Sequence, residues 1–274
     1  MRRAAEWALR GIMFVVGALL ALHAPPSAMA GTQARPLEVF APWCMEKRLR
    51  RIVEVFQEKR PSTPVRFATG TPGQLIKRVR AGGKPDVYIA MGPCEIEVLQ
   101  SMGLVDEGSA REILRQTLLL AVSEKAKETV AELRDLAKKE VNSVGMGRPT
   151  LTSGRLARAA LGKLGILDAV APKAKTSPLR QLVLGQVQAA VLYEQCCYEE
   201  DLHVGKPDLR RDIAAVRPLS RELCEPFPVV AAPLKHGAAH PDAAVFVATL
   251  CGKRAQDILH RRGDWSCPIC EMVP

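Results

Sequence analysis

The chain has 274 residues and is 47% hydrophobic, which is enough to bury a core and to form one large domain or two smaller ones. Its formal net charge is +10, yet the lysines and arginines are spread along predicted helices, and aromatic residues make up only 4%. We therefore interpret the charge as a solvated basic surface that attracts anions, and we expect no nucleic-acid partner.

The start of the chain has the pattern of a secretory signal. Arginines precede an apolar run over residues 11–22, and Ala28 and Ala30 follow it at the spacing of a cleavage site. The run is shorter than the ~20 residues that a membrane-spanning helix needs, so an anchor is the less favoured interpretation. We expect residues 1–30 to be a signal peptide that is removed, and the mature protein to be periplasmic.

Short apolar runs then alternate with stretches of helical period. The first half predicts a strand over 37–41, a helix ended by Pro61, a strand over 65–69, a helix ended by Gly82 and a strand over 86–90. Such alternation is typical of a parallel sheet flanked by helices.

A second unit begins near Thr117. Thr129 and Glu132 form a predicted capping box for a helix that runs to Lys139. The remaining predicted elements are strands over 118–122 and 141–146, helices over 153–164 and 178–184, strands over 189–193 and 227–232, and helices over 242–250 and 253–261. Because the strand over 227–232 can lead back to the first unit, we predict two lobes, residues 31–116 with 229–264 and residues 117–228.

Eight short motifs follow one another in an order that resembles the molybdate-binding proteins of ABC importers. They are Val39-Phe-Ala, Gly70-Thr-Pro-Gly-Gln-Leu, Lys84-Pro-Asp-Val-Tyr-Ile-Ala, Met102-Gly-Leu-Val, Ala189-Ala-Val-Leu-Tyr, Phe227-Pro-Val-Val-Ala-Ala, His240-Pro-Asp-Ala-Ala-Val-Phe and Arg254-Ala-Gln-Asp-Ile-Leu. The resemblance covers residues 37 to 264 and implies an α/β, two-lobed periplasmic-binding-protein fold, with two mixed or parallel sheets flanked by helices and a ligand cleft between the lobes. It also implies a solute-binding protein without enzymatic activity that serves an ABC permease, and we expect a monomer.

The resemblance further implies which residues line the cleft. The family holds a tetrahedral oxyanion with neutral donors, namely serine hydroxyls in the first two strand-to-helix loops, backbone N–H groups and a tyrosine of the second lobe. Tyr193 matches that tyrosine, Cys44 stands at the first serine position, and the second serine position falls at Thr71 or Pro72.

Cysteines occupy further positions that the resemblance assigns to the cleft. Cys94 follows the third strand, and Cys196 and Cys197 follow the tyrosine. A thiol is a weak hydrogen-bond donor, whereas thiolates bind Cu(I) and Zn(II) well. We therefore expect Cys44, Cys94 and Cys196 to ligate a thiophilic metal ion of the Cu or Zn class, with Cys197 and Cys224 as further candidates.

Three alternatives stay open. The ligand can be a molybdate- or tungstate-like oxyanion bound by Thr71, Tyr193 and backbone amides. Cys44 can be a buried small residue that replaces serine, or the cysteines can form disulfides, Cys44 with Cys94 or Cys196 with Cys224. Finally, the C-x-x-C pair Cys267 and Cys270 in the tail over 265–274 can serve a periplasmic thiol–disulfide or metal-handling protein.

Overall fold

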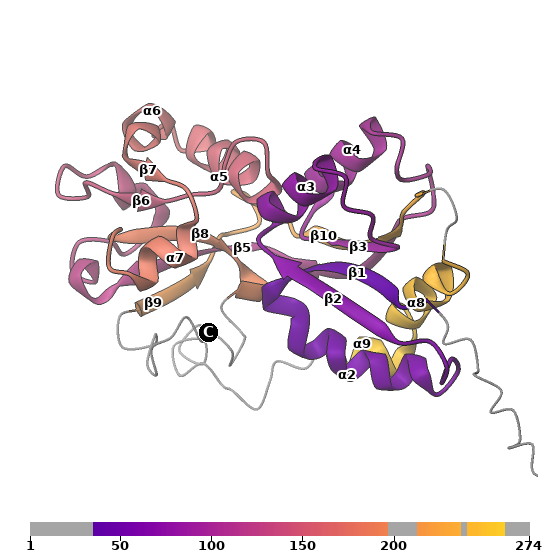
Figure 1. Cartoon of the computed structure of the whole chain (residues 1–274). Helices are drawn as coiled ribbons and strands as arrows, with labels where there is room; N and C mark the ends of the chain where they lie inside the picture. The colour runs from indigo at the N-terminus through magenta and orange to yellow at the C-terminus, as the bar shows by residue number, and fades with distance from the viewer. Residues whose placement is uncertain (1–34, 197–212, 237–239, 261–274) are drawn as a thin grey trace, which may run out of the picture. The chain divides into compact units, whose positions relative to one another are not determined.

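Two mixed β-sheets flanked by helices make up the part of the chain that the computed structural model describes, namely residues 35–196, 213–236 and 240–260 (Figure 1). The predicted signal peptide, Cys197 and the tail over 265–274 lie outside these residues. No helix within the described ranges has the length and apolar character needed to cross a membrane.

The first sheet has the strand order β2-β1-β3-β10-β4. β1 pairs in parallel with β2 and β3, whereas β10 pairs antiparallel with β3 and β4. The strands are β1 (Leu37–Pro42), β2 (Val65–Gly70), β3 (Val87–Ala90), β4 (Arg111–Gln116) and β10 (Phe227–Pro233). The helical segments associated with them are η1 (Trp43–Met45), α2 (Glu46–Gln57), α3 (Pro72–Arg80), α4 (Pro93–Ser101), α8 (Ala243–Leu250) and α9 (Lys253–His260).

Both faces of this sheet are covered, because successive side chains of a strand point to opposite faces. Val39 and Ala41 pack into the cluster that also holds residues of α2, α8 and α9. Phe40 and Tyr88 pack with α3 and α4 on the other face (Figure 1). This two-sided burial explains why β1 and β3 are almost uninterrupted apolar runs.

The second sheet has the order β7-β6-β8-β5-β9. β8 is parallel to β6 and antiparallel to β5, and β5 is antiparallel to β9. The strands are β5 (Leu118–Ser123), β6 (Val144–Gly145), β7 (Ala174–Lys175), β8 (Ala189–Tyr193) and β9 (Ile213–Pro218). The helices are α5 (Thr152–Lys163), α6 (Leu167–Val170) and α7 (Pro178–Val183), with short 3-10 turns η2 (Glu124–Ala126), η3 (Leu133–Ala137), η4 (Ala171–Lys173) and η5 (Glu194–Cys196).

The chain crosses from the first sheet to the second at Thr117 and returns through β10. Next to the crossing, the rings of Tyr193 and Phe227 are in contact, with centroids 6.1 Å apart. The Thr117 N–H donates to the Glu194 carboxylate at 3.1 Å, and the Glu194 N–H donates to the Thr117 carbonyl, also at 3.1 Å. These contacts hold the end of β8, and with it Tyr193, at the point where the two sheets meet.

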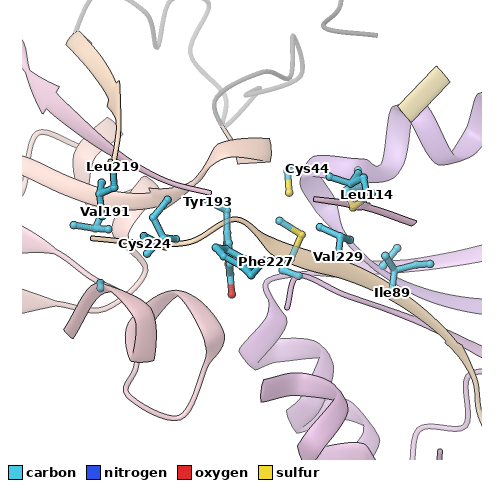
Figure 2. Close-up of a cluster of buried hydrophobic side chains, with 14 of the residues drawn as sticks. Cys44, Ile89, Leu114, Val191, Tyr193, Leu219, Cys224, Phe227 and Val229 are labelled. Carbon is cyan, nitrogen blue, oxygen red and sulfur yellow. The ribbon is translucent and has the colours of Figure 1, made fainter. Parts of the chain in front are cut away.

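One hydrophobic cluster extends through both sheets. It includes the fully buried Phe56 and Phe246 beside the first sheet and Leu118 and Val191 in the second. Part of this cluster, around Tyr193 and Phe227, is drawn in Figure 2. A continuous core of this kind makes the packing of each sheet depend on the other.

The structure corrects the predicted helix from Thr129 to Lys139. In its place lies η3, a 3-10 helix of five residues. The Asp135 carboxylate accepts the N–H groups of Ala131 and Glu132 at 2.8 and 3.0 Å, so it fixes a helix start later than the predicted one. The Thr129 N–H donates to the Ala126 carbonyl in a separate turn.

Other predicted elements are found within a few residues of their expected bounds, but the predicted strand over 141–146 is reduced to β6. Strands β4, β7 and β9, helices α4 and α6, and the 3-10 turns other than η3 have no counterpart among the predicted elements. Of these, α4 matters most, because it carries the side chain at the centre of the candidate site.

The contact between α2 and α8 gives a test of the fold. The rings of Phe56 and Phe246 meet edge to face, with centroids 5.3 Å apart, and both side chains are fully buried. We expect Phe246→Ala to lower the free energy of unfolding by about 3–5 kcal/mol, because it leaves a cavity. Phe246→Leu, which keeps most of the volume, should cost clearly less. Urea unfolding of the three proteins measures both effects, and equal costs would contradict the assigned packing.

Candidate functional site

A buried glutamate lies where α4 meets the N-terminus of α5. Glu95 is in the first turn of α4 and is 1% exposed. Its carboxylate accepts hydrogen bonds from the Thr152 N–H at 3.2 Å and the Thr152 hydroxyl at 2.7 Å. Thr152 is the first residue of α5. A side chain from the first sheet's helix is therefore bound by the start of a helix from the second.

Backbone groups and Tyr193 extend this contact into a network. The Cys94 N–H donates to the Thr152 hydroxyl oxygen at 3.1 Å, and the Ser153 N–H donates to the Tyr193 hydroxyl oxygen at 3.0 Å. The Tyr193 side chain also hydrogen-bonds to Glu95. The donors that converge here are thus backbone N–H groups and hydroxyls, and none of them carries a charge.

The electrostatic balance of the network raises the pKa of Glu95. Burial raises the pKa of Glu95 above its ordinary value of 4.5, and the hydrogen bonds from Thr152 and Tyr193 lower it by less. Burial and the neighbouring Glu95 charge raise the pKa of Tyr193 well above 10.0, so its hydroxyl stays protonated. Among the described residues, no lysine or arginine makes an ion pair or hydrogen bond with Glu95. The positive ends of helices α4 and α5 provide the compensation that is present.

Two glycines allow close packing around the start of α5. A Cβ atom on Gly92 would lie 2.3 Å from Thr152 Cγ2 and 2.6 Å from Thr152 Oγ1. A Cβ atom on Gly154 would lie 1.9 Å from the Arg148 carbonyl oxygen. Since such distances are far below van der Waals contact, a side chain at Gly92 would push α4 away from Thr152, and one at Gly154 would push α5 away from the turn before it.

A second contact joins α4 and α5 at the surface. Arg155 donates two hydrogen bonds of 2.9 Å to the Glu97 carboxylate, and both side chains are about half exposed. The hydrogen bond from Arg155 lowers the pKa of Glu97. Glu97 lies two residues from Glu95 on the same helix and has the same side chain. Its pKa is nevertheless shifted in the opposite direction, because it is lowered whereas that of Glu95 is raised.

The predicted cysteine ligands are distributed along the region where the sheets meet. Cys44 is buried in η1, which contacts η5, the turn that carries the half-buried Cys196. Cys94 is buried in the first turn of α4. Figure 2 shows Cys44 and Cys224 on opposite sides of the pair Tyr193 and Phe227. Cys224 is therefore separated from Cys44 by that pair.

The structure gives the expected metal site no support. Within the described residues, no three His, Cys, Asp or Glu side chains form a group that could hold a metal ion. Cys94, Cys196 and Cys224 have free thiols, so neither of the two disulfides considered above is formed. Burial raises the pKa of Cys94 and Cys224, which keeps both as thiols at neutral pH.

Thr71 and Tyr193, the other predicted ligand residues, have different surroundings. Thr71 is the N-cap of α3: its hydroxyl accepts the Gln74 N–H at 3.4 Å and donates to the Gln74 side chain at 3.0 Å. Its hydroxyl is thus engaged in a capping box. Tyr193, in contrast, lies in the Glu95 network.

Glu95, Thr152 and Ser153 are site residues that the sequence analysis missed. One signal for Glu95 is present in the sequence, because Glu95 precedes the fully buried Leu99 by four residues and therefore lies on the same face of α4. A glutamate on the apolar face of a helix is expected to be buried, and a buried carboxylate needs hydrogen-bond donors. The identity of the donor Thr152, which lies 57 positions further along the chain, is not available from that pattern.

Comparison with known proteins assigns the chain to a family. The family model described as "Bacterial extracellular solute-binding protein" matches residues 37–263. No curated protein matches the chain.

Solved structures confirm the predicted fold class. The chain is similar to the periplasmic molybdate-binding protein of Azotobacter vinelandii, with 18% identity and a TM-score of 0.65 over 83% of this chain and 97% of the other. The sulfate-binding protein SubI of Mycobacterium tuberculosis has 16% identity and a TM-score of 0.65 over 83% and 85% of the two chains. Iron-bound HitA of Pseudomonas aeruginosa has 19% identity and a TM-score of 0.56 over 82% and 83%. At these identities, the similarity is one of fold.

A pair of identical substitutions tests the close approach of α4 and α5. We expect Gly92→Ala to lower the free energy of unfolding by about 1–3 kcal/mol, because the new methyl group overlaps the Thr152 side chain. Gly162→Ala is the matched control. A Cβ atom there meets nothing within 4 Å, and alanine favours the helix by up to about 1 kcal/mol. Thermal and urea unfolding compare the two, and a neutral Gly92→Ala would contradict the geometry.

The raised pKa of Glu95 predicts a dependence of stability on pH. The folded protein keeps the Glu95 proton to higher pH than the unfolded chain, so a contribution to the free energy of unfolding is lost as pH rises from 4.5 through the raised value. Glu95→Gln should remove this loss and should gain stability relative to wild type as pH rises. The measurement is urea unfolding of both proteins across this pH range.

Glu97→Gln is the control for that experiment. Because the pKa of Glu97 is lowered, its contribution is lost as pH falls, and this exposed pair is worth at most about 1 kcal/mol. Parallel curves for wild type and Glu95→Gln would show that Glu95 does not titrate as described.

Proposed function

The chain belongs to the bacterial extracellular solute-binding proteins, and on this premise we propose that it captures a small oxyanion for an ABC-type importer. The anion would bind beside Tyr193, between the N-termini of α4 and α5. The chain would work in the periplasm after removal of residues 1–30, with a membrane permease as its partner and without catalysing a reaction.

The observation that carries this proposal is the buried carboxylate of Glu95. An anion of the protein itself is held by the Thr152 N–H and hydroxyl and by Tyr193, and no basic side chain pairs with it in the described residues. Backbone N–H groups at a helix start and hydroxyl donors are the groups that bind oxyanions without adding charge. These neutral donors lower the pKa of Glu95, although burial raises it by more. The Ser153 N–H and the Tyr193 hydroxyl would serve a ligand placed next to Glu95.

Capture would require the two sheets to separate and close again. The network joins α4 of the first sheet with α5 and β8 of the second, so a ligand between them would be enclosed when these elements meet. The proposed lobes, residues 31–116 with 229–264 and residues 117–228, would move as units about the crossing at Thr117.

A thiophilic metal ion is the less supported ligand. It would need Cys44, Cys94 and Cys196 to come together as thiolates, whereas Cys94 is a thiol of raised pKa. The oxyanion proposal needs no rearrangement of cysteines, since its donors already converge. Cys267 and Cys270 would then have no part in ligand binding.

Substitution of the tyrosine tests the proposal. We expect calorimetric titration to detect binding of phosphate, sulfate or molybdate by the full mature chain, and Tyr193→Phe to weaken it between about tenfold and a hundredfold because one donor is lost. Tyr88→Phe is the matched control: the buried Tyr88 hydroxyl has no hydrogen-bond partner among the described residues, so affinity should not change.

The same titrations with Zn(II) and Cu(I), run anaerobically on wild type and Cys44→Ser, address the metal. Tight metal binding that is lost in Cys44→Ser, together with no binding of the anions, would refute the oxyanion proposal. Unchanged anion affinity in Cys44→Ser is the result that we expect.

A further inference from the structure

We propose that Glu95 determines ligand specificity: the site takes up an oxyanion together with one proton, and it therefore prefers a phosphate group that keeps a hydrogen over sulfate or molybdate. This inference rests on the proposed function. It concerns the identity of the oxyanion. The positions of the donors alone do not determine that identity.

The first argument is the distance between Glu95 and any ligand that uses Tyr193. The Tyr193 hydroxyl is hydrogen-bonded to both the Ser153 N–H and Glu95. A ligand oxygen bound by either group would thus lie within about one hydrogen bond of the carboxylate. Two negative charges about 4 Å apart repel each other enough to weaken binding roughly a thousandfold at the effective dielectric of such sites. One proton shared between ligand and carboxylate converts this repulsion into a hydrogen bond.

The second argument is that no cation neutralises the carboxylate. The titratable groups on which Glu95 acts electrostatically include Tyr88, Cys94, Arg155 and Tyr193. The tyrosines and Cys94 have raised pKa values and are neutral at physiological pH. Arg155 is charged, but it is half exposed and is paired with Glu97. The charge on Glu95 is therefore not cancelled by a partner within the described residues.

A third observation concerns the other buried polar groups of this region, which include unused acceptors. Gln116 is 1% exposed, and its side-chain N–H donates to the Met91 carbonyl at 2.7 Å, directly before Gly92. Its side-chain oxygen accepts no hydrogen bond from the described residues. Exchanging the amide oxygen and nitrogen would not help, because the Met91 carbonyl would then lose its donor. Gln116 therefore adds an unsatisfied acceptor, and no donor, to this part of the junction.

Inorganic phosphate has this property and sulfate does not. At about pH 8, phosphate keeps one hydrogen, whereas sulfate and molybdate have none. A phosphomonoester has lost its hydrogen by then, because its second pKa is about 6. Phenyl phosphate, which has no hydroxyl group, therefore separates free phosphate from an esterified phosphate group of similar charge.

The test compares wild type, Glu95→Gln and Glu97→Gln by calorimetric titration at about pH 8 with phosphate, phenyl phosphate, sulfate and molybdate. Wild type and Glu97→Gln should bind phosphate at least about a hundredfold more tightly than sulfate or molybdate, and more tightly than phenyl phosphate. In Glu95→Gln the preference should fall to within about tenfold, mainly because sulfate and molybdate bind better. Equal affinities in wild type, or a preference that Glu95→Gln leaves unchanged, would overturn the inference while the proposed function stands.

A second measurement on wild type alone does not depend on whether a variant folds. Titration in two buffers with different ionisation enthalpies gives the number of protons taken up on binding. We expect sulfate to bind with uptake of up to one proton and to lose affinity as pH rises, by up to about tenfold per unit. Phosphate should bind without this uptake at about pH 8. Sulfate binding that is independent of pH and proton-neutral would contradict the role of Glu95, and absence of binding by all four anions would refute the proposed function together with it.

Discussion

The contact between Glu95 and the start of α5 is the interaction on which the arrangement of this protein depends. It is made in a buried place, where an ionised carboxylate is costly unless its oxygens receive hydrogen bonds. Thr152 supplies two of these bonds and Tyr193 another, so the two sheets meet at a point of satisfied polar groups within an otherwise apolar junction. Loss of any one donor would leave a buried charge or a buried N–H without a partner.

Small residues around this point are a consequence of the same contact. The distance between the α4 and α5 starts excludes a side chain at Gly92, and the turn before α5 excludes one at Gly154. The aromatic pair of Tyr193 and Phe227 then fills the space at the crossing strands and orients the tyrosine hydroxyl. Packing and hydrogen bonding are thus coupled at this site, because the network closes only when the helices approach fully.

The cysteines illustrate how chemistry inferred from residue type depends on environment. Thiols bind soft metals when they are ionised and converge, and the sequence places several of them in loops that the family resemblance assigns to one cleft. In the structure, burial raises the pKa of Cys94 and Cys224, and Cys44 and Cys224 lie on opposite sides of an aromatic pair. Near neutral pH, Cys94 and Cys224 therefore behave as small apolar side chains, which is how buried free cysteines usually behave.

The sequence by itself determined the sheet-and-helix alternation, because period-2 and period-3.6 patterns of Leu, Val and Ile depend on which face of each element is buried. It also indicated Tyr193 through its motif. The sequence did not predict the late start of η3, which Asp135 sets, or the shortness of β6. Both depend on local competition between hydrogen bonds. The binding of Glu95 by Thr152 was decided by tertiary structure alone. Residues more than fifty positions apart come within hydrogen-bond distance only after both sheets have folded and their helices have packed. A local periodicity in the sequence therefore does not predict this contact.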